Sequence, residues 1–147
     1  MAFLTFFLGF SGRIGRAQWW YGMLGIAFTI AVMFAIVIWS DHPLLAVPLV
    51  LFVFVSVYAL AVKRLHDRGR SGFWSLVFIF LPGVIDRISD RLTDHGALWW
   101  VLAVLSLALG LWGLLELGVL RGTDGNNDYG PDPLAQREPI GEPEATR

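Results

Sequence analysis

The chain has 147 residues, of which 56% are hydrophobic and 16% are charged, and its formal net charge is −1. This composition departs from that of soluble proteins in the direction of an integral membrane protein small enough to form one domain. The absence of cysteine excludes disulfides, thiolate metal sites and a cysteine nucleophile. The net charge is uninformative as a sum, because the charges are strongly segregated along the chain, and nucleic acid is not an implied partner.

Two apolar stretches in the first half of the chain have the length of membrane spans. Residues 1–12 are also apolar, but no basic residues precede them and they contain no cleavage motif, so we expect no removed signal peptide. Between positions 17 and 62 the one formal charge is Asp41. We predict a first span over residues 19–39, which as a helix reaches roughly 31 Å and matches a hydrocarbon core of about 30 Å. The second predicted span covers residues 44–62.

A third apolar run, residues 73–85, is short for a span, since as a helix it reaches roughly 20 Å. The charged stretch after it becomes amphipathic if wound as a helix, with arginine and aspartate residues spaced to pair. We expect a short amphipathic helix that extends the third span to about position 95 beyond a proline kink. The alternative places it flat on the membrane surface while the third run crosses thinly or re-enters. The pairs with this spacing are Arg87 with Asp90 and Arg91 with Asp94.

The fourth predicted span, residues 97–120, contains a single charge, Glu116. The fold class is therefore an all-α integral membrane protein. Four transmembrane helices occupy residues 1–120, with the short amphipathic helix between the third and the fourth. Residues 121–147 are predicted to form a polar turn and then a disordered tail after about Pro133, because they carry four of the seven prolines and few apolar side chains.

The distribution of basic residues predicts the orientation of the spans. Lys and Arg are retained on the cytoplasmic side, so four spans with an inside amino terminus place both termini in the cytoplasm of a bacterial inner membrane. If residues 73–85 do not cross, the basic residues divide almost as well, so this count favours four spans only modestly. The predicted cytoplasmic set is Arg13, Arg16, Lys63, Arg64, Arg68, Arg70 and Arg121, against Arg87 and Arg91 outside.

Three sequence blocks carry a resemblance to a known family. They are FSGRIGRAQWW at residues 10–20, VKRLHDRGRSGFW at residues 62–74 and GTDGNNDYGPDP at residues 122–133. In this order they resemble the bacterial inner-membrane family called domain of unknown function 805, the YhaH/YhaI-like proteins. The resemblance implies a small inner-membrane protein and brings no established activity. The charged segment 86–96 departs from the family pattern as an apparent insertion.

In the predicted orientation all three blocks meet on the cytoplasmic side. Arginine forks suit phosphate, glycines allow close backbone approach, and anionic lipid headgroups are the nearest abundant phosphates. We predict a non-enzymatic module, without a cofactor, that binds headgroups or a partner protein; the alternative is that these cations only set the topology. Self-association through small-residue helix faces stays open. The predicted ligand-binding residues are Arg13, Arg16, Lys63, Arg64, Asp67, Arg68, Arg70 and Tyr129.

Two further functions are weaker hypotheses. Glu116 lies within an apolar run, which is typical of ion or proton pathways and would suit a small transporter or channel. It is only about one turn from the cytoplasmic interface, however, where pairing with the basic residues costs less. His66 and Asp67 could serve a lipid-modifying enzyme, but no nucleophile accompanies them.

A metal site is not expected. His42 and His95 lie at the opposite end of the spans from His66, so no second imidazole is near it. The stretch DGNNDYG begins like a calcium-binding loop, but Tyr129 stands where glycine is needed and Ala135 where glutamate is needed. The family resemblance brings no metal ligand.

Overall fold

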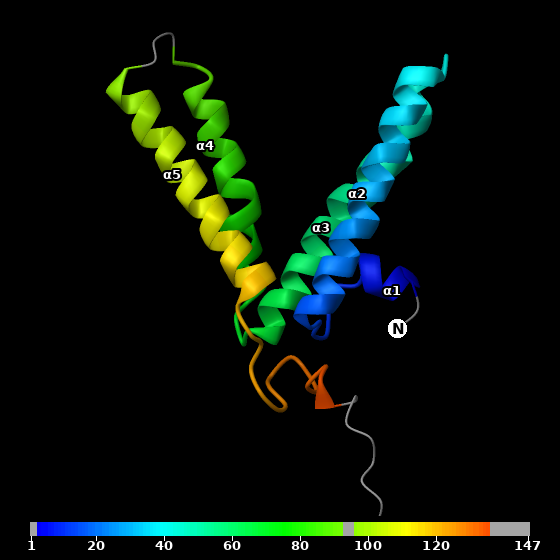
Figure 1. Ribbon diagram of the computed structural model, residues 1–147, viewed down its shortest axis with the longest axis vertical. Helices are drawn as coiled ribbons and strands as arrows, with labels where there is room; N and C mark the ends of the chain where they lie inside the picture. Colours follow the sequence, from blue (N-terminus) through cyan, green and yellow to red (C-terminus); the bar gives the residue numbers. More distant parts are fainter. Residues whose placement is uncertain (1–2, 93–95, 136–147) are drawn as a thin grey trace, which may run out of the picture.

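The protein consists of two helical hairpins that meet at one end. The computed structural model describes residues 3–92 and 96–135. In Figure 1, α2 and α3 run side by side, α4 and α5 run side by side, and the two pairs diverge from a shared lower end. We call this shared end the foot. The elements are α1 (Phe3–Leu8), α2 (Arg16–Trp39), η1 (Pro43–Ala46), α3 (Val47–Asp67), η2 (Leu76–Phe80), α4 (Leu81–Ser89), α5 (Ala97–Leu114) and η3 (Leu115–Val119).

Three helices are long and apolar enough to cross a membrane. They cover Arg16–Trp39, Pro43–Asp67 and Ala97–Val119, and these candidate spans coincide with the first, second and fourth predicted spans. The second span continues five residues beyond its predicted end at residue 62. The helix does not stop at the first charge, because Lys63, Arg64 and Asp67 are all buried and bonded within the protein.

The third run does not have the length of these spans. Residues 74–89 are helical without interruption, a length of roughly 24 Å. The π-helical turn η2 ends two residues before Pro82, with the Leu81 N–H bonded to the Leu76 carbonyl. A proline in a regular α-helix clashes with the carbonyl four residues earlier, and the wider turn relieves that clash. Four spans are therefore not confirmed: three helices qualify and this one falls short.

Of the charged stretch after the third run, residues 86–89 continue the same helix. It ends at Ser89, not near position 95, and no separate amphipathic helix is present in residues 90–92. No ion pair joins Arg87 to Asp90 in the described part of the chain, contrary to the prediction. Asp94, the predicted partner of Arg91, lies outside the described residues.

The short helix α1 has no counterpart among the predicted elements. Its Phe7 is buried and lies 5.6 Å from the ring of Phe52 on α3. The Lys63 ammonium donates to the Thr5 carbonyl at 3.1 Å and also to the Phe6 carbonyl. These carbonyls belong to the last turn of α1, where backbone N–H partners run out; the Thr5 carbonyl also accepts the Gly9 N–H at 3.2 Å. Lys63 thus caps α1 and does not face solvent.

Glycines set the spacing within both hairpins. A Cβ on Gly22 would lie 2.6 Å from Leu60 Cδ1, and a Cβ on Gly113 would lie 2.9 Å from Phe78 Cβ. Small residues of this kind let membrane helices approach closely. At Gly110, one turn before Gly113, an added Cβ would meet nothing within 4 Å.

Replacing Gly113 with leucine should force α5 away from the helix that carries Phe78. Overpacking of this kind costs about 1–3 kcal/mol, so the midpoint of thermal unfolding in detergent should fall by several degrees. Gly110→Leu is the matched control, with the same change on the same helix in open space, and it should unfold near the wild-type temperature. Equal midpoints for the two variants would show that this packing is misplaced.

Candidate functional site

The Asp67 carboxylate lies between two buried arginines at the foot. Arg13 contacts Oδ1 through Nε at 3.1 Å and through Nη2 at 3.0 Å, and Arg64 binds Oδ2 through Nη1. The exposed fractions of the three side chains are 1% for Arg13, 0% for Arg64 and 5% for Asp67. One carboxylate therefore faces two guanidinium groups, and the remaining guanidinium N–H groups need other acceptors.

Backbone carbonyls supply those acceptors. Arg13 donates to the carbonyls of Thr123 and Gly125, each at 2.6 Å. Arg64 donates through Nε to the Leu117 carbonyl at 2.9 Å and through Nη2 to the Leu120 carbonyl. The last carbonyls of η3 have no partner within the helix, so a buried arginine is well suited to bond them. The cluster thus attaches the tail to the ends of α3 and η3.

The tail forms a compact polar turn against α3, as its composition predicts. The Thr123 N–H donates to the Asp67 carbonyl at 2.8 Å, and the Asn127 amide donates to the His66 carbonyl at 2.9 Å. The Tyr129 ring stacks on the His66 ring with centroids 4.0 Å apart. Disorder is predicted after about Pro133. Of this segment, residues 136–147 lie outside the described residues.

Asp132 closes this turn. Its carboxylate accepts hydrogen bonds from the backbone N–H groups of Leu134 and Gly125, at 2.8 and 2.9 Å. These two bonds lower the pKa of Asp132 below its ordinary value, because they favour the ionised form. Asp132 is therefore used within the turn and is not a free acid.

A second ion cluster holds Glu116. This carboxylate is 2% exposed within η3, and its oxygens contact Arg68 Nε at 3.1 Å and Arg70 Nη2 at 2.9 Å. The Arg70 guanidinium also lies 5.5 Å from the Trp74 ring centre, in cation–π geometry. Arginines bind both oxygens of Glu116. This is the pairing with basic residues that we expect from its position near the interface, in preference to an ion pathway.

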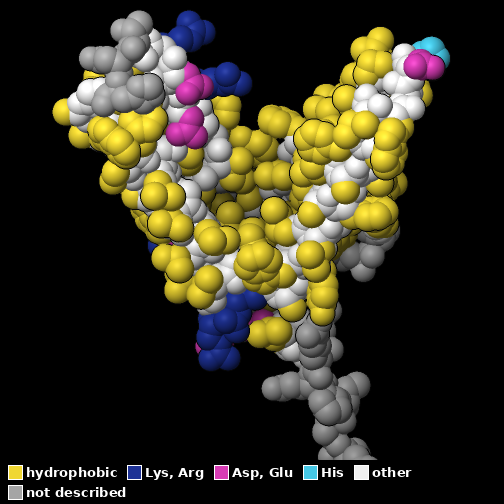
Figure 2. Space-filling model, turned by 45° about the horizontal axis from the view of Figure 1, so that its top comes forward, with side chains coloured by type: hydrophobic (Ala, Val, Ile, Leu, Met, Phe, Trp, Pro, Cys, Tyr) yellow, Lys and Arg dark blue, Asp and Glu magenta, His cyan; other side chains and the backbone are white. Residues whose placement is uncertain are grey.

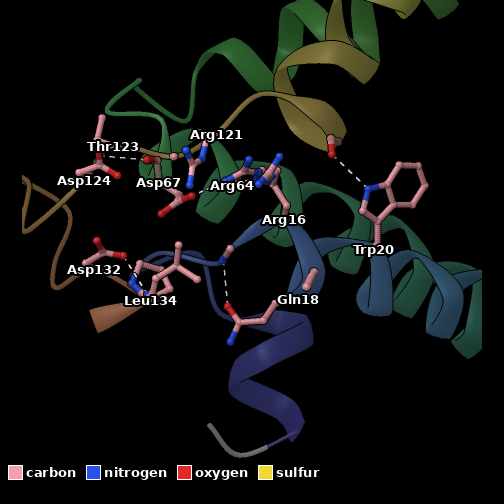
Figure 3. Close-up of a pocket in the computed structure, with 15 residues that line it drawn as sticks. Arg16, Gln18, Trp20, Arg64, Asp67, Arg121, Thr123, Asp124, Asp132 and Leu134 are labelled. Atoms are coloured by element: carbon pink, nitrogen blue, oxygen red, sulfur yellow. Dashed lines mark hydrogen bonds and ion pairs between the residues drawn. The ribbon is translucent and has the colours of Figure 1, made fainter. Parts of the chain in front are cut away.

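Beside the Asp67 cluster a cavity of about 420 Å³ opens at the start of α2. Arg16 and Arg121 line it, with Arg64 behind them, and Figure 3 shows these three guanidinium groups gathered together. Arg16 donates one hydrogen bond, to the Val119 carbonyl at 3.1 Å. Within residues 3–92 and 96–135, neither Arg16 nor Arg121 has a carboxylate at ion-pair distance. Asp124 and Asp132 line the other side of the cavity.

The structure brings seven of the eight predicted ligand-binding residues to the foot, but most of them face inward. Figure 2 shows basic side chains gathered there below an almost wholly hydrophobic surface. Lys63 faces α1, away from the others. The sequence predicts Arg121 to be on the cytoplasmic side, but Arg121 is not among the predicted ligand-binding residues. Its position between the last span and the tail block could have indicated that it lies near them. The seven are Arg13, Arg16, Arg64, Asp67, Arg68, Arg70 and Tyr129.

The contacts of His66 are structural. Its Nδ1 lies 3.3 Å from the Gly12 carbonyl and its ring is covered by Tyr129. Among the described residues, no group of three or more His, Cys, Asp or Glu side chains could hold a metal ion. His66 is thus held by a backbone carbonyl and an aromatic ring, and both oxygens of Asp67 are bound by arginines.

Comparison with known proteins gives one family and several relatives. The profile of the family described as "Protein of unknown function (DUF805)" matches residues 7–131. "Inner membrane protein YhaI" of Escherichia coli (strain K12) is 32% identical over 135 residues, covering 90% of this chain and 92% of the relative. "Uncharacterized protein YiiR" of the same strain is 31% identical, covering 90% of each chain, and "Inner membrane protein YhaH" is 26% identical, covering 86% and 88%. No solved structure matches.

Asp67→Asn should strongly destabilise the protein, because it leaves two buried guanidinium groups without a counter-charge. Removal of one partner from a buried ion pair costs about 3–5 kcal/mol. Glu116→Gln should cost clearly less, since Arg68 and Arg70 are 22% and 34% exposed and can turn toward water. Chemical denaturation of both variants in the same detergent measures the difference. A smaller loss for Asp67→Asn than for Glu116→Gln would contradict this assignment.

The tail passes close to the Asp67 carboxylate at Gly122. An added Cβ would lie 2.1 Å from Asp67 Oδ2, so Gly122→Ala should release the turn from α3. Limited proteolysis should then cleave within residues 122–135 at least several times faster than in the wild type. Gly15→Ala is the control, because its nearest neighbour would be 3.8 Å away, and its cleavage rate should not change.

Proposed function

The chain belongs to the DUF805 family, and on that premise we propose that it is a non-enzymatic module of the inner membrane that binds phosphate-bearing lipid headgroups at its foot. The proposed ligand-binding residues are Arg16 and Arg121. The observation that carries the proposal is the cavity at the start of α2, where these two arginines have no carboxylate partner among the described residues.

The foot is proposed to face the cytoplasm. Basic residues concentrate there, and Lys and Arg are retained on the cytoplasmic side. The leaflet on that side is rich in anionic lipids, which attract basic residues at the membrane surface. The Trp20 indole donates to the Gly118 carbonyl at 3.1 Å next to the cavity, a position that suits an interfacial tryptophan. The protein would then cross the membrane several times with both termini inside.

The arginines at the foot have different partners, and this difference supports the choice of Arg16 and Arg121. Arg13 and Arg64 are buried against Asp67, and Arg68 and Arg70 hold Glu116. Each carboxylate is matched by two guanidinium groups, so both clusters keep a net positive charge. That charge favours an anion on the side of the cavity away from Asp124 and Asp132, where Arg16 and Arg121 have N–H forks to bind a phosphate.

The contacts of Glu116 and Asp67 favour structural roles over transport and catalysis. Both oxygens of each carboxylate are bound by arginines. A proton or ion pathway through Glu116 would have to break two ion pairs. The cluster at Asp67 would have to open before that side chain could act on a lipid.

The test uses the full chain in nanodiscs that contain phosphatidylglycerol with a photoreactive group in its headgroup. Crosslinks in the wild type should map to peptides that contain residues 15–20 and 118–124. Attraction to an anionic surface is worth about 1 kcal/mol per basic residue, so Arg16→Gln with Arg121→Gln should lower crosslinking of these peptides about thirtyfold.

Arg87→Gln with Arg91→Gln is the matched control, because it removes the same charge at the opposite end of the helices. It should leave crosslinking at the foot unchanged. Undiminished crosslinking in the Arg16 and Arg121 variant would overturn the proposal and would favour a partner protein as the ligand of this end.

A further inference from the structure

An apolar groove separates the two hairpins on the side away from the foot. Its volume is about 960 Å³, and Figure 2 shows the hollow between the two arms lined by hydrophobic side chains. One wall comes from α2 and α3, including Val53 and Val57, and the other from η2 and α4, including Val84 and Ile88. At the foot the hairpins close, where Gly118 packs against Trp19 and Trp20. The groove therefore has a closed floor and an open mouth.

Two arginines are the charged residues of the groove. Arg87 and Arg91 lie one turn apart near the end of the helix that forms its wall, and both line the mouth. Among the described residues, neither has a carboxylate at ion-pair distance. Asp86 on the same helix and Asp90 directly after it do not line the groove. The groove is thus apolar along its walls and cationic at one end.

The dimensions of the groove match one leaflet of a bilayer. Ile79 and Ile88 are the first and last residues of this helix that line the groove, which corresponds to roughly 14 Å at 1.5 Å per residue. Half of a hydrocarbon core is about 15 Å, so a chain that lies along the groove reaches from the headgroup level to the middle of the membrane. Arg87 and Arg91 then stand where a phosphate would be.

We propose that this groove binds one glycerophospholipid from the leaflet opposite the foot, with its acyl chains between α3 and α4 and its phosphate on Arg87 and Arg91. An amphiphile with an anion at one end satisfies both features of the groove. A second copy of the chain fits it less well. Its long helices α2 and α5 carry no acidic residue, so one of them in the groove would leave both arginines unpaired. This site is separate from the cavity at the foot.

Gly83 offers a way to fill the groove without disturbing the fold. It lines the groove, and an added Cβ would meet nothing within 4 Å. Gly83→Phe should therefore occupy lipid space, and the loss of a helical glycine should not destabilise the helix. Gly110→Phe is the matched control, since it also adds a ring in open space but lies outside the groove.

The experiment places the full chain in nanodiscs with a phospholipid that carries a diazirine in its acyl chain. Crosslinks in the wild type should concentrate on the peptides that contain Val53 to Tyr58 and Val84 to Ile88. Gly83→Phe should lower this labelling at least fivefold, and Gly110→Phe should not. Arg87→Gln with Arg91→Gln should lower labelling by the phospholipid about tenfold while labelling by diacylglycerol with the same diazirine, which lacks the phosphate, stays the same.

Three results would overturn the proposal. The first is even labelling of all lipid-facing helices, which indicates annular lipid. The second is labelling of the groove that Gly83→Phe does not change. The third is efficient disulfide formation between two copies of a Val53→Cys variant of this cysteine-free chain, which would make a second copy the occupant. Arg16→Gln with Arg121→Gln should not alter groove labelling, so failure at the foot and failure at the groove are distinguishable.

Discussion

The structure depends on one buried carboxylate. Asp67 at the end of α3 is bound by Arg13 and Arg64, and neither guanidinium could remain buried without it. Because a buried charge must be paired and fully hydrogen-bonded, this requirement fixes the loop before α2 and the turn after η3 at the same end of the helices. The three sequence blocks of the family contain these segments. One ion cluster therefore joins both hairpins.

The sequence predicts the apolar helices well and the use of the charges poorly. Length and hydropathy are enough for the first, second and fourth spans, since those properties decide whether a helix can cross a bilayer. The helix over residues 74–89 is harder to predict, because it continues through Pro82 with the help of a π-helical turn. Lys63 caps a helix and Arg64 bonds the end of η3. Such partners are distant in sequence and appear only once the hairpins are packed.

The arginines at the two ends of the molecule have different surroundings. At the foot Arg13 and Arg64 are buried against Asp67, and Arg68 and Arg70 pair with Glu116, which leaves Arg16 and Arg121 at a cavity. At the other end the hairpins separate, and Arg87 and Arg91 stand at the mouth of an apolar groove. Closure at the foot and opening at the mouth have the same cause. The ion pairs that join the hairpins lie at the foot. The glycine contacts lie at the foot or between the helices of one hairpin.

A double-mutant cycle between Arg13 and Asp67 tests the central claim most directly. Unfolding free energies would be measured for Arg13→Ala, Asp67→Ala and the double variant in one detergent. If the two side chains form one buried pair, the coupling energy should be about 1–3 kcal/mol, since the second substitution removes a group that has already lost its partner. Additive effects within about 0.5 kcal/mol would show that the pair does not hold the foot together.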